Sequence, residues 1–149
     1  MRDPARIVVA QCTGSKRDGT HAARDLYDES AYFRKQRAYA ETADKWFIQS
    51  AKYGLLEPDE SVESYDTHAK ELEDPEAWAE AIANHLDSEV GKPAVVELLG
   101  GKRYADPLTP ALEARGFDVV EPFRGLGIGE RMAALDTKVT EVSHASLHG

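Results

Sequence analysis

Four short apolar segments alternate along the chain with segments of helical spacing, and this alternation limits the chain to an α/β fold. The apolar segments lie near residues 6–11, 46–51, 94–99 and 118–122. Each consecutive pair is separated by enough residues for a crossover helix, which favours parallel pairing in one sheet. We therefore predict a three-layer Rossmann-like α/β sandwich with a mostly parallel sheet of about four strands.

The helix signals are clearest at Asp74-Pro75, where a capping aspartate precedes a proline at the first helical position. Asp28 or Ser30 is expected to cap an earlier helix. A single domain over residues 1–149 is expected, since a chain of this length buries a core without disulfides. The helices are predicted over residues 30–45, 74–90, 106–115 and 128–135, with long loops over 13–28 and 53–73 and no predicted structure over 136–149.

The charge of the chain limits its partners. The formal net charge is −9, which argues against tight binding to duplex nucleic acid, because that requires Lys and Arg to neutralise phosphates. A local basic pocket for a small nucleotide-like or anionic ligand is still compatible with it. The acidic composition fits a halophilic protein from a high-salt cytoplasm, and it fits an acidic mesophilic protein as well. No apolar run is long enough to cross a membrane, so a cytoplasmic protein is expected; the oligomeric state is left open.

Polar residues follow the first predicted strand. Ligands of open α/β sheets bind beyond the carboxyl ends of the strands, and Cys12, Gly14, Ser15 and Lys16 would lie there. The backbone N–H groups of this loop, together with Lys16, could hold an anion, or the loop is an ordinary surface turn. Cys12 is the only cysteine. It is either an activated nucleophile or a small buried apolar residue.

The second predicted strand ends in a similar way, at Ser50, Lys52, Tyr53 and Gly54. Serine and lysine can act together as nucleophile and base, or both can bind the polar edge of a ligand. The Tyr53 ring could stack on a base. In the structural alternative, Tyr53 packs under the following loop and Gly54 makes the turn.

Glycines follow the third and fourth predicted strands and allow close approach of a ligand to the backbone. Arg124 adds a positive charge suited to bidentate phosphate binding. Together these segments predict further ligand-binding residues at Gly100, Gly101, Tyr104, Arg124, Gly125, Gly127 and Gly129.

Two loop aspartates beside tyrosines, Asp25 and Asp66, are the candidate carboxylates for proton transfer or for stabilising a sugar cation. Either could instead make a turn or cap a helix. The five histidines form no metal-binding set, and no cofactor motif is found, because the upstream glycine of a P-loop is absent.

Several motifs occur together in a fixed order, including Ser50-Ala51-Lys52-Tyr53-Gly54-Leu55, Tyr65-Asp66 and a terminal Gly-Leu-Gly-Ile-Gly over residues 125–129. With Cys12 to Lys16, Asp25-Leu26-Tyr27 and Gly101 to Tyr104, they resemble a family of small prokaryotic proteins of uncharacterised function (a domain of unknown function). More loosely, the chain is similar to YaaA-like proteins and to a domain of archaeal tRNA-deazaguanine modification enzymes. This resemblance implies nucleobase or nucleic-acid chemistry by analogy.

These observations favour an enzyme that hydrolyses an N-glycosidic bond, or transfers a base, in a nucleotide or nucleoside. Asp66 or Asp25 would handle the proton or the sugar cation, with Ser50 and Lys52 as further catalytic candidates. Lys16 and Arg124 would hold phosphate. The alternatives are a non-catalytic sensor of a nucleotide-like ligand and a DNA-associated stress-response protein, the second disfavoured by the acidic charge.

Overall fold

The fold is built on a five-stranded sheet whose central strand is the first in the sequence. The computed structural model describes residues 3–13, 16–64 and 72–148. Strand β1 (Ala5–Gln11) pairs in parallel with β3 (Lys45–Ser50) on one side and with β6 (Ala94–Leu98) on the other. Strand β7 (Asp118–Val120) continues in parallel, and β4 (Gly54–Leu56) adds an antiparallel edge, giving the order β4-β3-β1-β6-β7.

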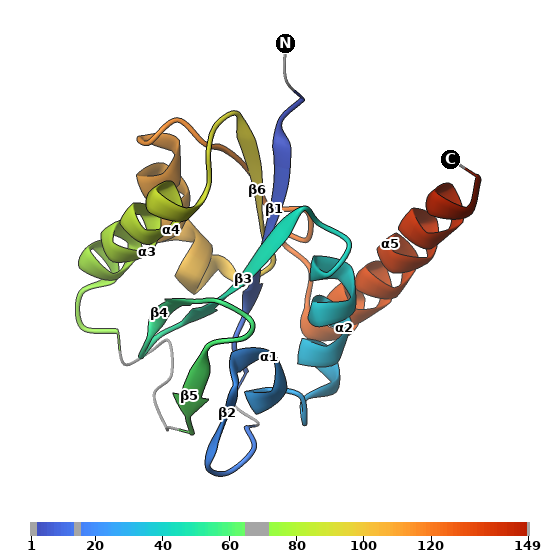
Figure 1. The fold of residues 1–149 in the computed structure, drawn as a ribbon, viewed down its shortest axis with the longest axis horizontal. Helices are drawn as coiled ribbons and strands as arrows, with labels where there is room; N and C mark the ends of the chain where they lie inside the picture. The colour runs from blue at the N-terminus through green and yellow to red at the C-terminus, as the bar shows by residue number, and fades with distance from the viewer. Residues whose placement is uncertain (1–2, 14–15, 65–71, 149) are drawn as a thin grey trace.

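Two pairs of helices cover the two faces of the sheet (Figure 1). Helices α3 (Pro75–Glu89) and α4 (Lys102–Glu113) pack against each other on one face. Helices α2 (Ala31–Ala40) and α5 (Ile128–His148) pack against each other on the opposite face. The expected α/β fold with a mostly parallel sheet is confirmed. The sheet is mixed, however, because β4 folds back on β3 through a short turn.

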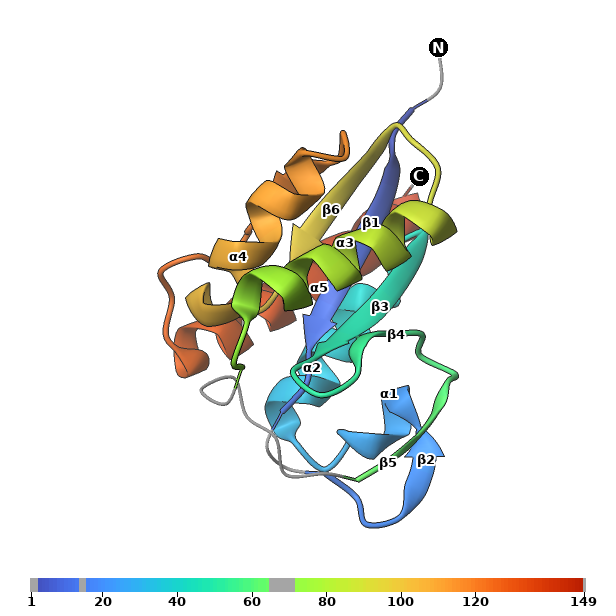
Figure 2. The ribbon, with the colours of Figure 1, turned by 90° about the vertical axis from the view of Figure 1, so that its left-hand side faces the viewer.

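A small unit lies beyond the carboxyl ends of β1 and β3 (Figure 2). It consists of the antiparallel pair β2 (Thr20–Ala22) and β5 (Ser61–Glu63), with the short helix α1 (Ala23–Leu26). Backbone hydrogen bonds from Ala23 to Glu60 (2.8 Å) and from Arg24 to Pro58 (2.9 Å) join its two halves. This unit occupies the two segments that the sequence predicted to be long loops.

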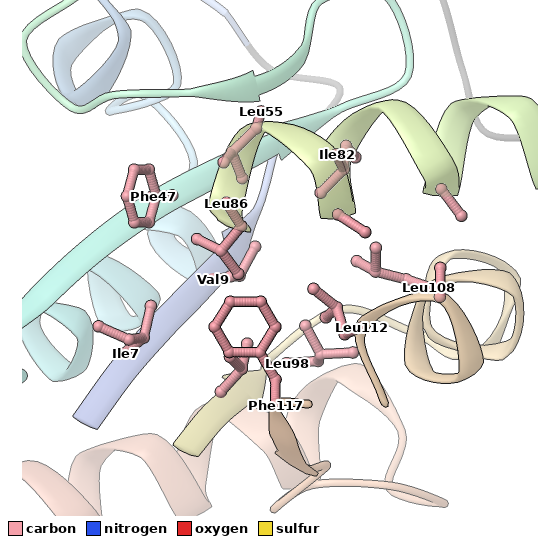
Figure 3. Packing of buried hydrophobic residues seen from close by; sticks show 14 of the residues in the cluster. Ile7, Val9, Phe47, Leu55, Ile82, Leu86, Leu98, Leu108, Leu112 and Phe117 are labelled. Atoms are coloured by element: carbon pink, nitrogen blue, oxygen red, sulfur yellow. The ribbon is translucent and has the colours of Figure 1, made fainter. Parts of the chain in front are cut away.

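Alternating residues of the central strands fill two apolar cores, one on each face. Ile7 and Val9 of β1 contribute to the core beneath α3 and α4, together with Phe47, Leu86 and Leu98 (Figure 3). On the other face, Val8 and Ala10 pack with residues of α2, and Cys12 belongs to this second core. The period-two alternation of a strand buried on both faces explains why β1 reads as a continuous apolar run.

The helix boundaries agree with the sequence prediction at two N-caps and differ at three other ends. Helix α2 ends at Ala40 rather than near Lys45, which is already the first residue of β3. The Ser30 and Asp74 side chains accept from the N–H groups of Phe33 and Ala77, as N-caps of α2 and α3. Helix α4 begins at Lys102, one turn before the predicted start at Asp106-Pro107, so Pro107 lies inside the helix rather than at its first position. Helix α5 continues from Ile128 to His148, through the segment for which no structure was predicted. None of the helices in the described part of the chain combines the length and apolarity needed to cross a membrane.

Candidate functional site

A cavity lies beside the place where the chain connections leave the central strand in opposite directions. From β1 the chain passes to β3 on one side, and it later crosses to β6 on the other. Such a change of direction leaves a crevice at the carboxyl ends of the two neighbouring strands, and ligands of open α/β sheets bind there. A cavity of about 530 Å³ is found here, lined by Gln11, by Gly101 to Tyr104, by Gly125 and Leu126, and by Arg131. We call it the basic crevice.

The N-terminus of helix α4 opens into the basic crevice. Its N-cap residue is Gly101, which offers no side chain to cap the helix. Within the described residues, the backbone N–H groups of Lys102 and Arg103 have no acceptor. Their side chains are exposed and carry two positive charges to the same place. Unpaired N–H groups and the positive end of a helix dipole attract anions.

Arg131 contributes a buried positive charge to the crevice. The residue is only 7% exposed. Its Nη1 donates to the Leu99 carbonyl (2.8 Å) and its Nε donates to the Leu126 carbonyl (2.9 Å). Among the described residues, no carboxylate lies within ion-pair distance of the guanidinium, and its Nη2 has no acceptor. A buried charge destabilises the folded protein unless a counter-charge accompanies it. An anionic ligand would supply that counter-charge to Arg131.

The end of β1 is held in place from both sides. Gln36 of α2, which is fully buried, accepts from the Gln11 N–H (2.8 Å) and donates to the Gln11 carbonyl (3.2 Å). The Gln11 Oε1 in turn accepts from the Gly101 N–H (2.7 Å). The Gln11 Nε2 has no acceptor among the residues described. Gln11 therefore fixes the β6–α4 turn and presents a donor to the crevice.

A model of a family of unknown function, DUF6884, matches residues 7–137. The chain belongs to the DUF6884 family. No curated protein and no solved structure matches it. The matched residues include all those that line the basic crevice, from Gln11 to Arg131.

In this DUF6884 protein, some predicted ligand-binding residues gather at the crevice. Gly101, Tyr104 and Gly125 line it, and Gly100 forms the turn beside it. The Tyr104 ring packs against Trp78, with 5.5 Å between the ring centroids. Gly127 and Gly129 follow at the start of α5. The Gly127 N–H donates to the Glu130 carboxylate (3.2 Å), which caps this helix.

Arg124, the residue predicted to bind phosphate, lies in two ion pairs. Its Nη1 is 2.6 Å from Glu121, and its Nη2 is 3.0 Å from Asp106. Glu121 and Asp106 raise the pKa of the arginine, which keeps it charged. Arg124 is not among the residues that line the basic crevice. The positively charged residues that line the crevice are instead Lys102, Arg103 and Arg131.

The residues predicted after the second strand make a tight turn. The Ser50 Oγ accepts from the N–H groups of Lys52 (3.2 Å) and Tyr53 (3.1 Å), and the Ser50 carbonyl accepts from the Trp78 ring N–H (2.9 Å). The Lys52 Nζ lies 5.3 Å from the centre of the Tyr53 ring. Gly54 has a φ of 74°, a conformation that favours glycine. Gly54 therefore makes the turn, and the residues of this segment lie outside the crevice lining.

The remaining candidates are dispersed. Cys12 is buried in the core beneath α2, and Lys16 is partly exposed in the loop after β1. Asp25 lies in α1, where its carboxylate is 3.3 Å from the Arg37 guanidinium. Gly14, Ser15 and Asp66 lie outside the described residues. Across the described part of the chain, no group of three or more His, Cys, Asp or Glu side chains is placed to hold a metal ion.

Sequence reasoning missed the residues that give the crevice its charge. Lys102 and Arg103 follow Gly100-Gly101 at a strand end, the same kind of signal that indicated Lys16, and could have been found in that way. Arg131 carries no local signal, because it is three residues inside α5. Only the packing of α5 against the β6–α4 turn brings its guanidinium to the Leu99 carbonyl.

Proposed function

We propose that this DUF6884 protein binds a nucleotide-like ligand at the carboxyl edge of its sheet, with the phosphate in the basic crevice. The observation that carries this proposal is the Arg131 guanidinium, which is buried beside the N-terminus of α4 without a carboxylate partner among the described residues. The Gln11 Nε2 and the N–H groups of Lys102 and Arg103 add further donors. A lining rich in donors selects a ligand rich in acceptors, and charge-assisted bonds to phosphate are among the strongest available.

The dimensions and position of the crevice support the same function. Its volume of about 530 Å³ falls within the roughly 300–1,000 Å³ that is typical of small-molecule sites. Helices on both faces of a mostly parallel sheet support a Rossmann-like three-layer arrangement, in which nucleotides bind at this edge. The acidic remainder of the surface repels other polyanions, so a small ligand fits better than duplex DNA.

The reaction that we propose is cleavage or exchange of the ligand's N-glycosidic bond. In hydrolysis, the bond between the sugar carbon and the base nitrogen breaks, the hydroxyl of water joins the sugar and its proton goes to the base. This step needs a carboxylate to stabilise the sugar cation or to activate water. The Asp25 carboxylate is paired with Arg37. We propose Asp66, which lies outside the described residues, as the carboxylate for this step. The likeness to YaaA-like proteins and to tRNA-deazaguanine enzymes is part of this proposal.

Calorimetric titration with nucleoside monophosphates, ribose 5-phosphate and nucleosides tests the binding site. We expect the phosphorylated compounds to bind and the unphosphorylated nucleosides to bind more weakly. Lys102→Gln and Arg103→Gln remove exposed side chains, so they should weaken phosphate binding by about tenfold each without unfolding the protein. Lys138→Gln is the matched control, because it removes one exposed positive charge outside the crevice. Equal affinities of Lys102→Gln, Arg103→Gln and Lys138→Gln would contradict the proposal.

Chromatographic detection of the released base tests the reaction. Wild-type protein should release free base from the monophosphate that it binds, and Asp66→Asn should abolish release while binding is retained. Binding without release by wild-type protein would favour the non-catalytic sensor. Binding of oligonucleotides that weakens steeply with salt would favour the DNA-associated protein.

A further inference from the structure

One buried side chain beside the basic crevice has no hydrogen-bond partner in the part of the chain that the structure describes. Gln49, near the end of β3, is 1% exposed, and both its Nε2 and its Oε1 lack a partner among the described residues. An amide removed from water without compensating bonds destabilises the folded protein. Such a group is retained where it serves a purpose other than stability.

A second buried glutamine at this end of the sheet, Gln36, has a structural role. Gln36 is buried to the same degree, and both of its amide atoms are bonded to the backbone of Gln11. Gln49 lies directly across the β1–β3 pair from Gln11, in register with it. Gln11 and Gln49 therefore belong to one polar cluster at the sheet edge. Among the described residues, Gln49 is the member of that cluster whose amide lacks a partner at both its nitrogen and its oxygen.

The β6–α4 turn is shaped around these amides. A side chain at Gly100 would overlap the Gln49 Nε2, and its Cβ would lie 2.9 Å from the Gln11 Oε1. Gly100 therefore lets the turn lie directly on both amides, and Gly101 continues it into the wall of the basic crevice. A small shift of this glycine pair, or a rotation of the long Gln49 side chain, would bring the buried amide into the crevice.

We propose that Gln49 recognises the nucleobase of the ligand, through the paired donor and acceptor of its amide. This inference rests on the proposed function, and it adds selection of the nucleobase, which the phosphate site does not provide. A primary amide forms two parallel hydrogen bonds with a base edge that presents an adjacent acceptor and donor. Base binding satisfies both orphan atoms of Gln49, and the Gln11 Nε2 lies beside them as an additional donor.

Substitution of Gln49 by methionine separates recognition from stability. Methionine has a similar length and no polar group to leave unpaired. Gln49→Met should raise the thermal unfolding midpoint of the unliganded protein, because a buried unsatisfied amide is removed. The same variant should bind the preferred nucleoside monophosphate about tenfold or more weakly, and it should bind ribose 5-phosphate, which has no base, as tightly as wild type does.

The outcomes distinguish this inference from the phosphate site on which it rests. If wild-type protein binds none of the phosphorylated compounds, the proposed function fails and the inference fails with it. If wild type binds the nucleoside monophosphates no better than ribose 5-phosphate, or if Gln49→Met binds them as wild type does, the base-recognition role is overturned while the phosphate site stands. A lowered unfolding midpoint or loss of folding in Gln49→Met would assign the amide a structural role and would also overturn the inference.

Discussion

The side-chain amide of Gln36 binds both backbone polar groups of Gln11, accepting from its N–H at 2.8 Å and donating to its carbonyl at 3.2 Å. This pair connects helix α2 to the last residue of the central strand. The backbone of Gln11 therefore finds its partners in a side chain of α2, while the next N–H, that of Cys12, still donates to the Gln49 carbonyl of β3 (3.1 Å). The position of the Gln11 side chain at the crevice therefore depends on Gln36 of α2, which lies on the face of the sheet opposite to α4.

Loss of the Gln36 amide should destabilise the protein. Gln36→Met would leave the half-buried N–H and carbonyl of Gln11 without their side-chain partners, at a cost of at most about 1–3 kcal/mol for each group. Urea unfolding should show a lower free energy of unfolding for Gln36→Met. Gln49→Met is the matched comparison, since the same change at a similarly buried glutamine removes no hydrogen bond. Similar losses of stability in the two variants would show that these contacts do not decide the effect.

Tyr39 should make stability depend on pH in the alkaline range. Its hydroxyl donates to the Glu97 carboxylate, and burial, followed by this contact, raises the pKa of Tyr39 to about 12. An unfolded tyrosine titrates near pH 10, so between roughly pH 10 and pH 12 only the unfolded state loses the proton. The stabilisation is therefore complete below pH 10 and is lost as the pH rises towards 12.

Urea unfolding between pH 9 and pH 12 measures this effect, with Tyr39→Phe as the comparison. The phenylalanine variant should be less stable than wild type at neutral pH, because Glu97 loses a donor. Its stability should also fall less steeply with pH than that of wild type. Parallel pH curves for the two proteins would mean that Tyr39 titrates normally.

Gly125 should be intolerant of a side chain for a reason of backbone conformation alone. Its φ is 87°, and a Cβ added there would meet nothing within 4 Å. Gly125→Ala is therefore expected to cost about 1 kcal/mol through the left-handed backbone. Gly91→Ala has equally open surroundings and no positive φ, so it should be neutral or slightly stabilising. Thermal unfolding of both variants provides the test, and an equal effect would refute the conformational explanation.

Salt should stabilise the protein if repulsion between carboxylates is significant. Glu73, Asp74, Glu76, Glu80 and Asp106 line one cavity of about 700 Å³ between α3 and α4. Screening by KCl should raise the thermal unfolding midpoint. The double variant Glu73→Gln with Glu76→Gln should show a smaller rise, whereas Glu113→Gln, at the far end of α4, should behave as wild type does. A midpoint that falls or stays constant in wild type would count against a halophilic origin.

The sequence predicts the elements whose signals are local. The four parallel strands were predicted because each is a run of apolar, often β-branched residues, and α3 because Asp74 and Pro75 mark its start. Strands β2, β4 and β5 have three residues each, and their existence depends on the partner that each one finds. No window of sequence contains that information.

The same distinction applies to the candidate site. Glycines after strands indicated Gly101 and Gly125 as crevice residues, since a turn at a strand end is a local feature. The prediction that Arg124 binds phosphate did not take into account Glu121, three residues earlier. The Glu121 carboxylate forms an ion pair with the Arg124 guanidinium. The role of Arg131 depends on α5 crossing to the β6–α4 turn. The catalytic roles of Asp25, Asp66, Ser50 and Lys52 remain predictions.

The residues that line the basic crevice come from positions spread along the chain, from Gln11 to Arg131. During synthesis, the end of β1 leaves the ribosome first, and the guanidinium that completes the crevice follows about 120 residues later, which takes roughly 6–24 s at typical elongation rates. A nascent chain that lacks α5 has β1, β6 and the start of α4 but no buried cation between them. The ability to retain an anion should therefore arise late in synthesis, and ligand retention by ribosome-bound chains of increasing length would time the docking of the last helix.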